Sequence, residues 1–157
     1  MTQTLTVRSA SHLAGALDAA GERTFTLARP FLGFPGSRLF RLRGLGERYE
    51  PFMSLSSLDE PSLGFIVVAP GALFSDYVVE IADADVALLG LEGSDDVEML
   101  VLVSRHPGAT PTVNLIGPLV VNRRTEVGTQ IVLQDSPYAV AVPVDAPSAC
   151  DRAARPT

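Results

Sequence analysis

Proline and glycine divide the middle of this chain into short segments, and their spacing restricts the fold more than any other feature. The 157 residues contain 12 Pro and 13 Gly. Proline lacks the backbone N–H that a helix interior or a central strand needs, and glycine favours turns over regular structure. Short segments between such residues, rich in apolar and β-branched side chains, are typical of an all-β domain.

The segments between these breaks have the composition of strands. Thr24–Ala28 alternates threonine with apolar residues, the pattern of a half-buried strand. Gly64–Ala69 is a continuous apolar run, which predicts a strand buried on both faces. The other strands that we expect are 4–8, 39–42, 52–55, 77–81, 98–104, 112–116, 119–122 and 130–133, and residues 140–142 end the ordered pattern. The chain therefore predicts about nine or ten short strands.

Two short stretches have helical spacing instead. Residues 10–20 carry alanine and leucine at helical intervals and end before Gly21, a suitable C-cap. Residues 83–90 predict a second helix, with Asp83 capping its N-terminus and Gly90 closing it. Because helices do not alternate regularly with strands, a doubly wound parallel sheet is disfavoured. We expect an all-β, mainly antiparallel fold, a small β-barrel or roll with one or two short helices.

Charge and composition exclude several functions. The length corresponds to one domain. Twelve cationic residues against 18 acidic ones give a net charge of −6, so the chain lacks the positive surface that binds nucleic acid directly. The sequence contains no lysine, which excludes a P-loop lysine, a Schiff base and a Ser–Lys nucleophile pair. The single cysteine, Cys150, excludes an internal disulfide and a multi-cysteine zinc site.

The sequence carries no signal for a membrane. No stretch approaches the roughly 18 apolar residues of a membrane span, and the N-terminus lacks a basic segment followed by an apolar one. We therefore expect a cytoplasmic protein with no membrane partner.

Metal and catalytic motifs are also missing. The acidic clusters at 83–85 and 95–98 do not form a calcium loop, because Ala87 stands at the third ligand position and no glycine follows it in the required place. His12 and His106 are far apart and form no zinc-binding pair. We predict no catalytic residue, no cofactor and no metal site. Arg123–Arg124 either contacts an acidic partner or a phosphate, or forms the solvated turn of a hairpin.

Three phrases, in order along the chain, resemble one protein family. They are TFTLARPFLGFPGSRLFRL at 24–42, SLDEPSLGFIVVAPGALFSDYVVEI at 57–81 and NLIGPLVVNRRTEVGTQIVLQDSPY at 114–138. The last is the most specific, with an Asn-Leu-x-x-Pro block that ends in a second asparagine and an Asp-Ser-x-Tyr close. Over about residues 24–143 the sequence resembles the FliW family of flagellar assembly factors.

The resemblance implies a non-enzymatic switch protein. FliW proteins bind the translational regulator CsrA and antagonise it allosterically, which relieves repression of flagellin mRNA. They also bind flagellin, which competes for the same pool of FliW. The resemblance implies one barrel domain over residues 1–143, in which 1–23 form an N-terminal strand and helix region, followed by a flexible tail at 144–157. We expect a monomer.

Candidate partner-binding residues come from two sources. The first set matches the family's most specific block and consists of Asn114, Leu115, Pro118, Asn122, Gln130, Asp135, Ser136 and Tyr138. The second set is a possible acidic face and consists of Asp59, Glu60, Asp76, Asp95 and Asp96. For the first set an architectural role, in turns and at the core edge, is the alternative. Phe31, Phe34, Phe52 and Phe74 flank turns and are expected in the core rather than at an interface.

Two other functions stay open. The chain could be a small-ligand-binding or hydrolytic barrel that uses His106 with a carboxylate as acid and base. It could also be a chaperone that binds flagellin alone.

Overall fold

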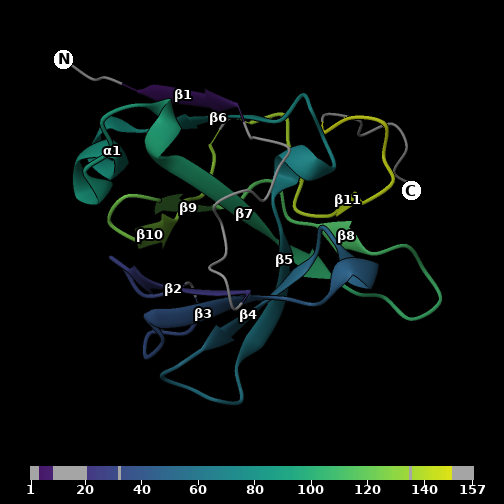
Figure 1. Ribbon diagram of the computed structural model, residues 1–157. Coiled ribbons are helices and arrows are strands. Elements are labelled where there is room, and N and C mark those ends of the chain that lie inside the picture. The colour runs from purple at the N-terminus through teal and green to yellow at the C-terminus, as the bar shows by residue number, and fades with distance from the viewer. Residues whose placement is uncertain (1–3, 9–20, 32, 135, 150–157) are drawn as a thin grey trace.

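The computed structural model describes residues 4–8, 21–31, 33–134 and 136–149 (Figure 1). In this part of the chain, strands dominate and one α-helix is present. The strands are β1 (Leu5–Arg8), β2 (Glu22–Leu27), β3 (Leu39–Gly44), β4 (Met53–Ser57), β5 (Gly64–Val68), β6 (Val78–Ile81), β7 (Val97–Ser104), β8 (Thr112–Val113), β9 (Leu119–Asn122), β10 (Val127–Gln130) and β11 (Val142–Pro143). The helix is α1 (Asp83–Leu89), and the 3-10 turns are η1 (Glu47–Tyr49), η2 (Pro70–Ala72) and η3 (Ser94–Asp96). The all-β expectation is confirmed.

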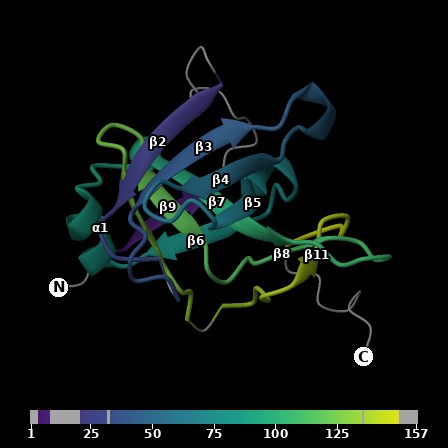
Figure 2. The ribbon, with the colours of Figure 1, turned by 90° about the horizontal axis from the view of Figure 1, so that it is seen from below.

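Seven strands close into a barrel in the order β7-β5-β4-β3-β2-β10-β9, because β9 pairs back onto β7. Every neighbouring pair is antiparallel except β10 and β2, which run parallel. Beyond the barrel, β8 and β11 extend the sheet from β7, and β1 and β6 form a separate two-stranded sheet. Figure 2 shows β6 below the barrel strands β2 to β5 in that view.

The barrel interior is filled by every second residue of its strands, as the period of a strand requires. β3 contributes Phe40 and Leu42, and β7 contributes Leu100. The remaining buried members of this cluster are Phe25, Leu27, Phe31, Met53, Leu55, Val67, Leu119 and Val121. Arg23 stands two residues before Phe25 on the same face of β2, and its guanidinium pairs with the carboxylate of Glu98.

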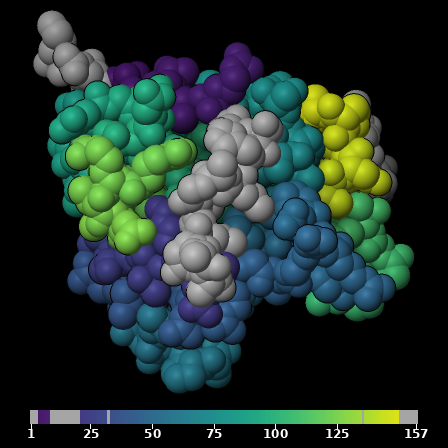
Figure 3. Space-filling model, viewed as in Figure 1, coloured from purple at the N-terminus to yellow at the C-terminus, as the bar shows by residue number. Residues whose placement is uncertain are grey.

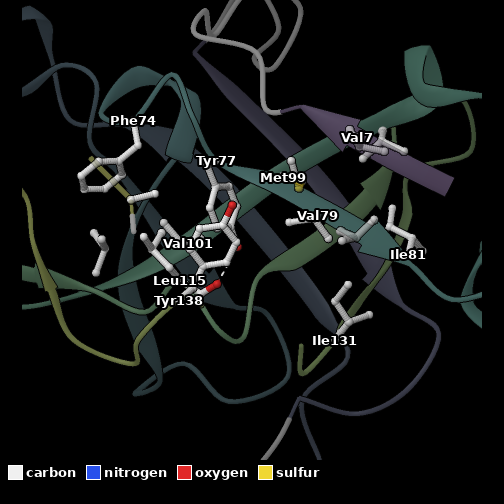
Figure 4. Close-up of a cluster of buried hydrophobic side chains, with 14 of the residues drawn as sticks. Val7, Phe74, Tyr77, Val79, Ile81, Met99, Val101, Leu115, Ile131 and Tyr138 are labelled. Atoms are coloured by element: carbon white, nitrogen blue, oxygen red, sulfur yellow. Dashed lines mark hydrogen bonds between the residues drawn. The ribbon is translucent and has the colours of Figure 1, made fainter. Parts of the chain in front are cut away.

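A second core lies between the barrel wall and the β1–β6 sheet (Figure 4). The alternate residues of β7, Met99 and Val101, point into it, opposite to Leu100. The small sheet contributes Val7 and Val79 from its inner face. Since both faces of β7 are buried, this strand is the central wall between the two cores.

Aromatic side chains fill one region of the barrel core. The Phe31 ring stacks on Phe65 with centroids 5.0 Å apart and lies 5.6 Å from Phe40. Phe34 packs edge-on against Phe65 at 5.8 Å. Phe31 and Phe74 are both buried, so the expected core location is confirmed for these two. Phe52 is only partly buried and packs at the edge of the second core.

Several expected elements differ from the structure. The strand expected at 130–133 is β10, which starts at Val127 and ends at Gln130. It ends there because the next partner in the ladder is Pro118, which accepts a bond from the Ile131 N–H but has no N–H to return. The strand expected at 112–116 stops at Val113, because Asn114 Oδ1 accepts bonds from the N–H groups of Ile116 and Gly117 and forms a turn.

Two further expectations were wrong in part. Ala82, not Asp83, occupies the N-cap of α1, and it makes no side-chain bond there; Asp83 is the first helical residue. Gly90 does close the helix in the left-handed conformation, at φ 65°.

β5 is not buried on both faces, because Gly64 is exposed and Ile66 is half-buried. The helix expected at 10–20 lies outside the described residues, which resume at Gly21.

Ordered structure continues beyond residue 143. The Val144 N–H donates to Pro111 O, and the Ala149 N–H donates to Asp76 Oδ1 at 3.0 Å. Ala149 is buried in the second core. Residues 144–149, which the sequence assigned to a loose tail, therefore pack on the domain.

Candidate interaction surfaces

A groove of about 540 Å³ lies between the small sheet and the segment that follows β10. One wall is formed by β6, and the other by residues 131–134 and 136–138. We call it the β6 groove, and its lining residues are Thr6, Val78, Glu80, Ala82, Asp85, Ile131, Val132, Leu133, Gln134, Ser136, Pro137 and Tyr138.

Two of the candidate partner-binding residues line this groove. The Tyr138 hydroxyl accepts a hydrogen bond from the Val78 N–H at 2.9 Å, which ties the two walls together. The Tyr138 ring packs on Tyr77, with centroids 4.7 Å apart (Figure 4). Ser136 Oγ accepts a bond from the Tyr138 N–H and holds that turn in place. Asp135, the third member of the motif, lies outside the described residues.

Tyr77, whose ring packs on Tyr138, joins this region to the core. Its hydroxyl donates to the Leu115 carbonyl at 2.7 Å inside the core, and Leu115 is itself fully buried. Burial raises the pKa of Tyr77 well above its ordinary value, so the hydroxyl stays protonated and remains a donor. The candidate residue Leu115 is thus an internal contact and not a surface one.

Asn114, Pro118 and Gln130 meet in one turn. Asn114 closes it through the bonds to the next N–H groups, and Gln130 Nε2 donates to the Gly117 carbonyl at 3.1 Å. Pro118 is buried in the same turn. These contacts support the architectural alternative for the three residues.

Asn122 holds the end of helix α1 against the β9–β10 turn. It is fully buried; its Nδ2 donates to Leu89 O at 2.8 Å, and its Oδ1 accepts from the Arg124 N–H at 2.9 Å. Figure 3 shows this turn lying directly against the helix on the surface. Arg124 adds a bond from Nη2 to Gly90 O.

We expect Asn122→Ala to lower the free energy of unfolding by about 2 kcal/mol, because it leaves the buried Leu89 carbonyl and the partly buried Arg124 N–H without their side-chain partner. Urea unfolding of the wild type and the variant measures this difference. Thr125→Ala, at an exposed position of the same turn, is the matched control and should change stability by less than about 0.5 kcal/mol. Equal stabilities of the two variants would contradict the architectural role.

Asp96 joins the same cluster. Its Oδ1 accepts from Arg124 Nε at 2.9 Å, and its Oδ2 accepts from the Glu92 N–H at 2.8 Å. The bond from Arg124, followed by the bond from Glu92, lowers the pKa of Asp96 below its ordinary value of 3.8. The folded chain therefore holds this proton less tightly than the unfolded chain.

The sign of the resulting pH dependence is set by this lowered pKa. The stabilisation is fully present above the ordinary value of 3.8 and is lost as the pH falls through the lowered folded value. The stability difference between wild type and Asp96→Asn should be constant from about pH 5 to 7 and shrink below about pH 4. Urea midpoints at each pH measure it, with Asp95→Asn at the exposed neighbouring residue as control. A difference that grows towards low pH would refute this account.

The acidic candidates come from three segments of the chain: the β4–β5 loop, the segment between η2 and β6, and η3. Asp59 accepts bonds from the N–H groups of Leu39 and Arg38, which lower its pKa and fix the β4–β5 loop. Asp76 is bonded to Ala149, and Asp96 to Arg124. Glu60 is half-buried beside the Asp59 loop, and Asp95 is exposed in η3. The carboxylates of Asp59, Asp76 and Asp96 therefore each have a structural role in their own segment.

A second hollow, of about 520 Å³, was not found from the sequence. We call it the Tyr49 hollow, and its lining residues are Leu45, Tyr49, Phe52, Ile66, Val103, Arg105 and Pro111. It lies on the outer side of β5 and β7 beside η1, and the Tyr49 side chain is 54% exposed. Ile66 and Val103 are only half-buried because they line this hollow. An apolar run in the sequence does not show that some of its side chains are open to solvent.

The His106 alternative gains no support from the geometry. His106 is exposed, and its Nε2 lies 3.2 Å from Thr112 Oγ1. It lines neither the β6 groove nor the Tyr49 hollow. Among the described residues, no group of three or more His, Cys, Asp or Glu could hold a metal ion. No helix in the described part of the chain is long and apolar enough to cross a membrane.

Comparison with known proteins gives a consistent result. The model of the FliW protein family matches residues 8–144. Three relatives carry the name flagellar assembly factor FliW. The one from Bacillus licheniformis is 36% identical over 78% of this chain and 86% of its own length. The one from Magnetococcus marinus is 37% identical over 82% and 81%, and the one from Bacillus subtilis 31% over 83% and 91%.

A solved structure has the same fold. The crystal structure of a flagellar assembly factor FliW superposes with a TM-score of 0.72 at 25% sequence identity, covering 83% of this chain and 89% of the other. The similarity therefore covers the barrel and most of its surroundings in both sequence and structure.

Proposed function

The chain belongs to the FliW family, and we propose that it is a flagellar assembly factor that binds CsrA and flagellin. The observation that supports this most strongly is the match of the family model over residues 8–144, which includes the barrel, β6 and α1. We propose that the protein acts in the cytoplasm and without catalysis.

The proposed mechanism is partner switching. Binding of this protein to CsrA would weaken the hold of CsrA on flagellin mRNA from a surface away from the RNA. Accumulating flagellin would then occupy the protein, free CsrA would return, and flagellin synthesis would fall. The net charge of −6 supports such a role, because a partner that binds RNA carries positive charge and is attracted by an acidic surface.

Binding to the two partners can be tested with purified proteins. The chain is mixed with CsrA, with flagellin, and with both, and the complexes are separated by size-exclusion chromatography and quantified by calorimetry. We expect a complex with each protein, and we expect flagellin to displace CsrA when added in excess. The affinity for CsrA should fall as the salt concentration rises.

The outcomes separate the alternatives. Binding of flagellin without CsrA would support a flagellin-only chaperone. Binding of neither protein would contradict the proposed function. His106→Ala is included as a control variant and is expected to bind both partners like the wild type.

A further inference from the structure

One edge of the β1–β6 sheet is open to the β6 groove. β1 covers the other edge, with Val7 opposite Val79 and Thr6 opposite Glu80. The Val78 N–H donates to the Tyr138 hydroxyl, so it points away from β1. In an antiparallel pair, the backbone groups of every second residue point to the same side. The N–H and C=O of Glu80 therefore also point away from β1, and no hydrogen bond joins them to another described residue.

The opposite wall of the groove also has backbone N–H and C=O groups that point away from the barrel. The N–H groups of Ile131 and Leu133 donate to Pro118 O and Ile116 O, on the barrel side. By the same alternation, the N–H and C=O of Val132 point away from the barrel side. The Val132 side chain is 55% exposed, and Ile131 is buried beneath the groove.

The charge of the groove restricts what can occupy it. Its charged lining residues are Glu80 and Asp85, and no basic residue lines it. Asp85 pairs with Arg29, whereas Glu80 forms no ion pair with any described residue. Two copies of this chain joined through β6 would bring their Glu80 carboxylates together, so the edge is protected from self-association. A partner segment with positive charge is favoured instead.

We propose that the β6 groove binds an extended, basic segment of a partner protein as a third strand of the β1–β6 sheet. The partner backbone bonds to Glu80 N–H and C=O, and its side chains alternate between the two faces. Apolar side chains point inward over Ile131 and Leu133, and a cationic side chain points outward beside the Glu80 carboxylate. The proposal rests on the proposed function, since a protein-binding role supplies the partner.

A synthetic peptide tests this directly. The probe is a capped seven-residue peptide with valine at every second position, arginine at the centre and threonine elsewhere. It is titrated to millimolar concentration into the full chain, and amide hydrogen exchange is followed by NMR. We expect saturable binding and at least about tenfold slower exchange of the Glu80 amide in the complex.

Two variants and one peptide control separate strand addition from loose charge attraction. Glu80→Arg should weaken binding at least about tenfold, whereas Glu47→Arg, the same charge change at an exposed residue outside the groove, should change it less than about twofold. A peptide with glutamate in place of arginine should bind at least about tenfold more weakly than the probe. Absence of binding, binding without protection of Glu80, or equal effects of the two variants would each overturn the proposal.

The same variants keep this proposal distinct from the proposed function. If CsrA and flagellin bind the wild type and Glu80→Arg equally well, strand addition in the groove is wrong and the proposed function stands. If the peptide binds as expected but neither protein does, the groove proposal stands and the proposed function fails.

Discussion

Phe40→Ala is expected to lower the free energy of unfolding by about 3–5 kcal/mol. Phe40 is fully buried in the barrel interior, with its ring centroid 5.6 Å from Phe31 and 6.3 Å from Phe25. Strands on all sides surround the site, so the barrel cannot collapse to fill the cavity. Urea unfolding followed by circular dichroism measures the loss.

The adjacent residue of the same strand is the matched control. Leu39 is 38% exposed and points to the outside of the barrel. Leu39→Ala should therefore cost less than about 1 kcal/mol. If Leu39→Ala were as destabilising as Phe40→Ala, the assignment of the two faces of β3 would be wrong.

Gly128→Ala is expected to destabilise the protein by about 3 kcal/mol, because it opens the seam that closes the barrel. Gly128 lies in β10, between the antiparallel neighbour Val121 and the parallel neighbour Leu27. A Cβ at this position would lie 2.8 Å from both Val120 O and Val121 Cγ2. The carbonyl is backbone and cannot move without disturbing β9.

Gly93 offers the same substitution without the clash. Its backbone is extended, at φ −178°, and a Cβ there would meet nothing within 4 Å. Gly93→Ala should leave the free energy of unfolding within about 0.5 kcal/mol of the wild type, or raise it slightly. Thermal unfolding of both variants gives the comparison. A stable Gly128→Ala variant would contradict the close approach of β9 and β10.

Much of the barrel could be predicted because its strands carry local signals. Thr24–Ala28 alternates, and β2 has that alternation, with Phe25 and Leu27 buried. The strand expected at 98–104 was found as β7 at Val97–Ser104. In these segments the hydrophobic period and the turn residues point to the same structure.

Closure of the barrel could not be predicted from local patterns. The parallel pairing of β10 with β2 joins Gly128 to Leu27, about a hundred residues apart in sequence. The residue types at 130–133 indicate a strand, yet the β9–β10 ladder ends at Gln130. It ends there because the next residue on the β9 side is Pro118, which has no N–H. Such boundaries depend on a neighbour that is distant in sequence.

The candidate partner-binding residues fall into two groups, those that line a groove and those that are buried. Ser136 and Tyr138 line the β6 groove, whereas Asn122 and Leu115 are buried in the structure itself. A sequence motif does not show whether a residue makes a buried hydrogen bond within the fold or lies at an interface with a partner. The Tyr49 hollow was missed because it forms only where η1 meets β5 and β7.

Release of RNA from CsrA tests the central claim most directly. The purified chain is titrated into a preformed complex of CsrA with a labelled flagellin mRNA leader, and bound RNA is followed by fluorescence anisotropy. If the chain is a CsrA antagonist, RNA is released in a saturable manner, and flagellin added afterwards restores RNA binding. Full retention of the RNA at every concentration of the chain, with CsrA active, would contradict the account.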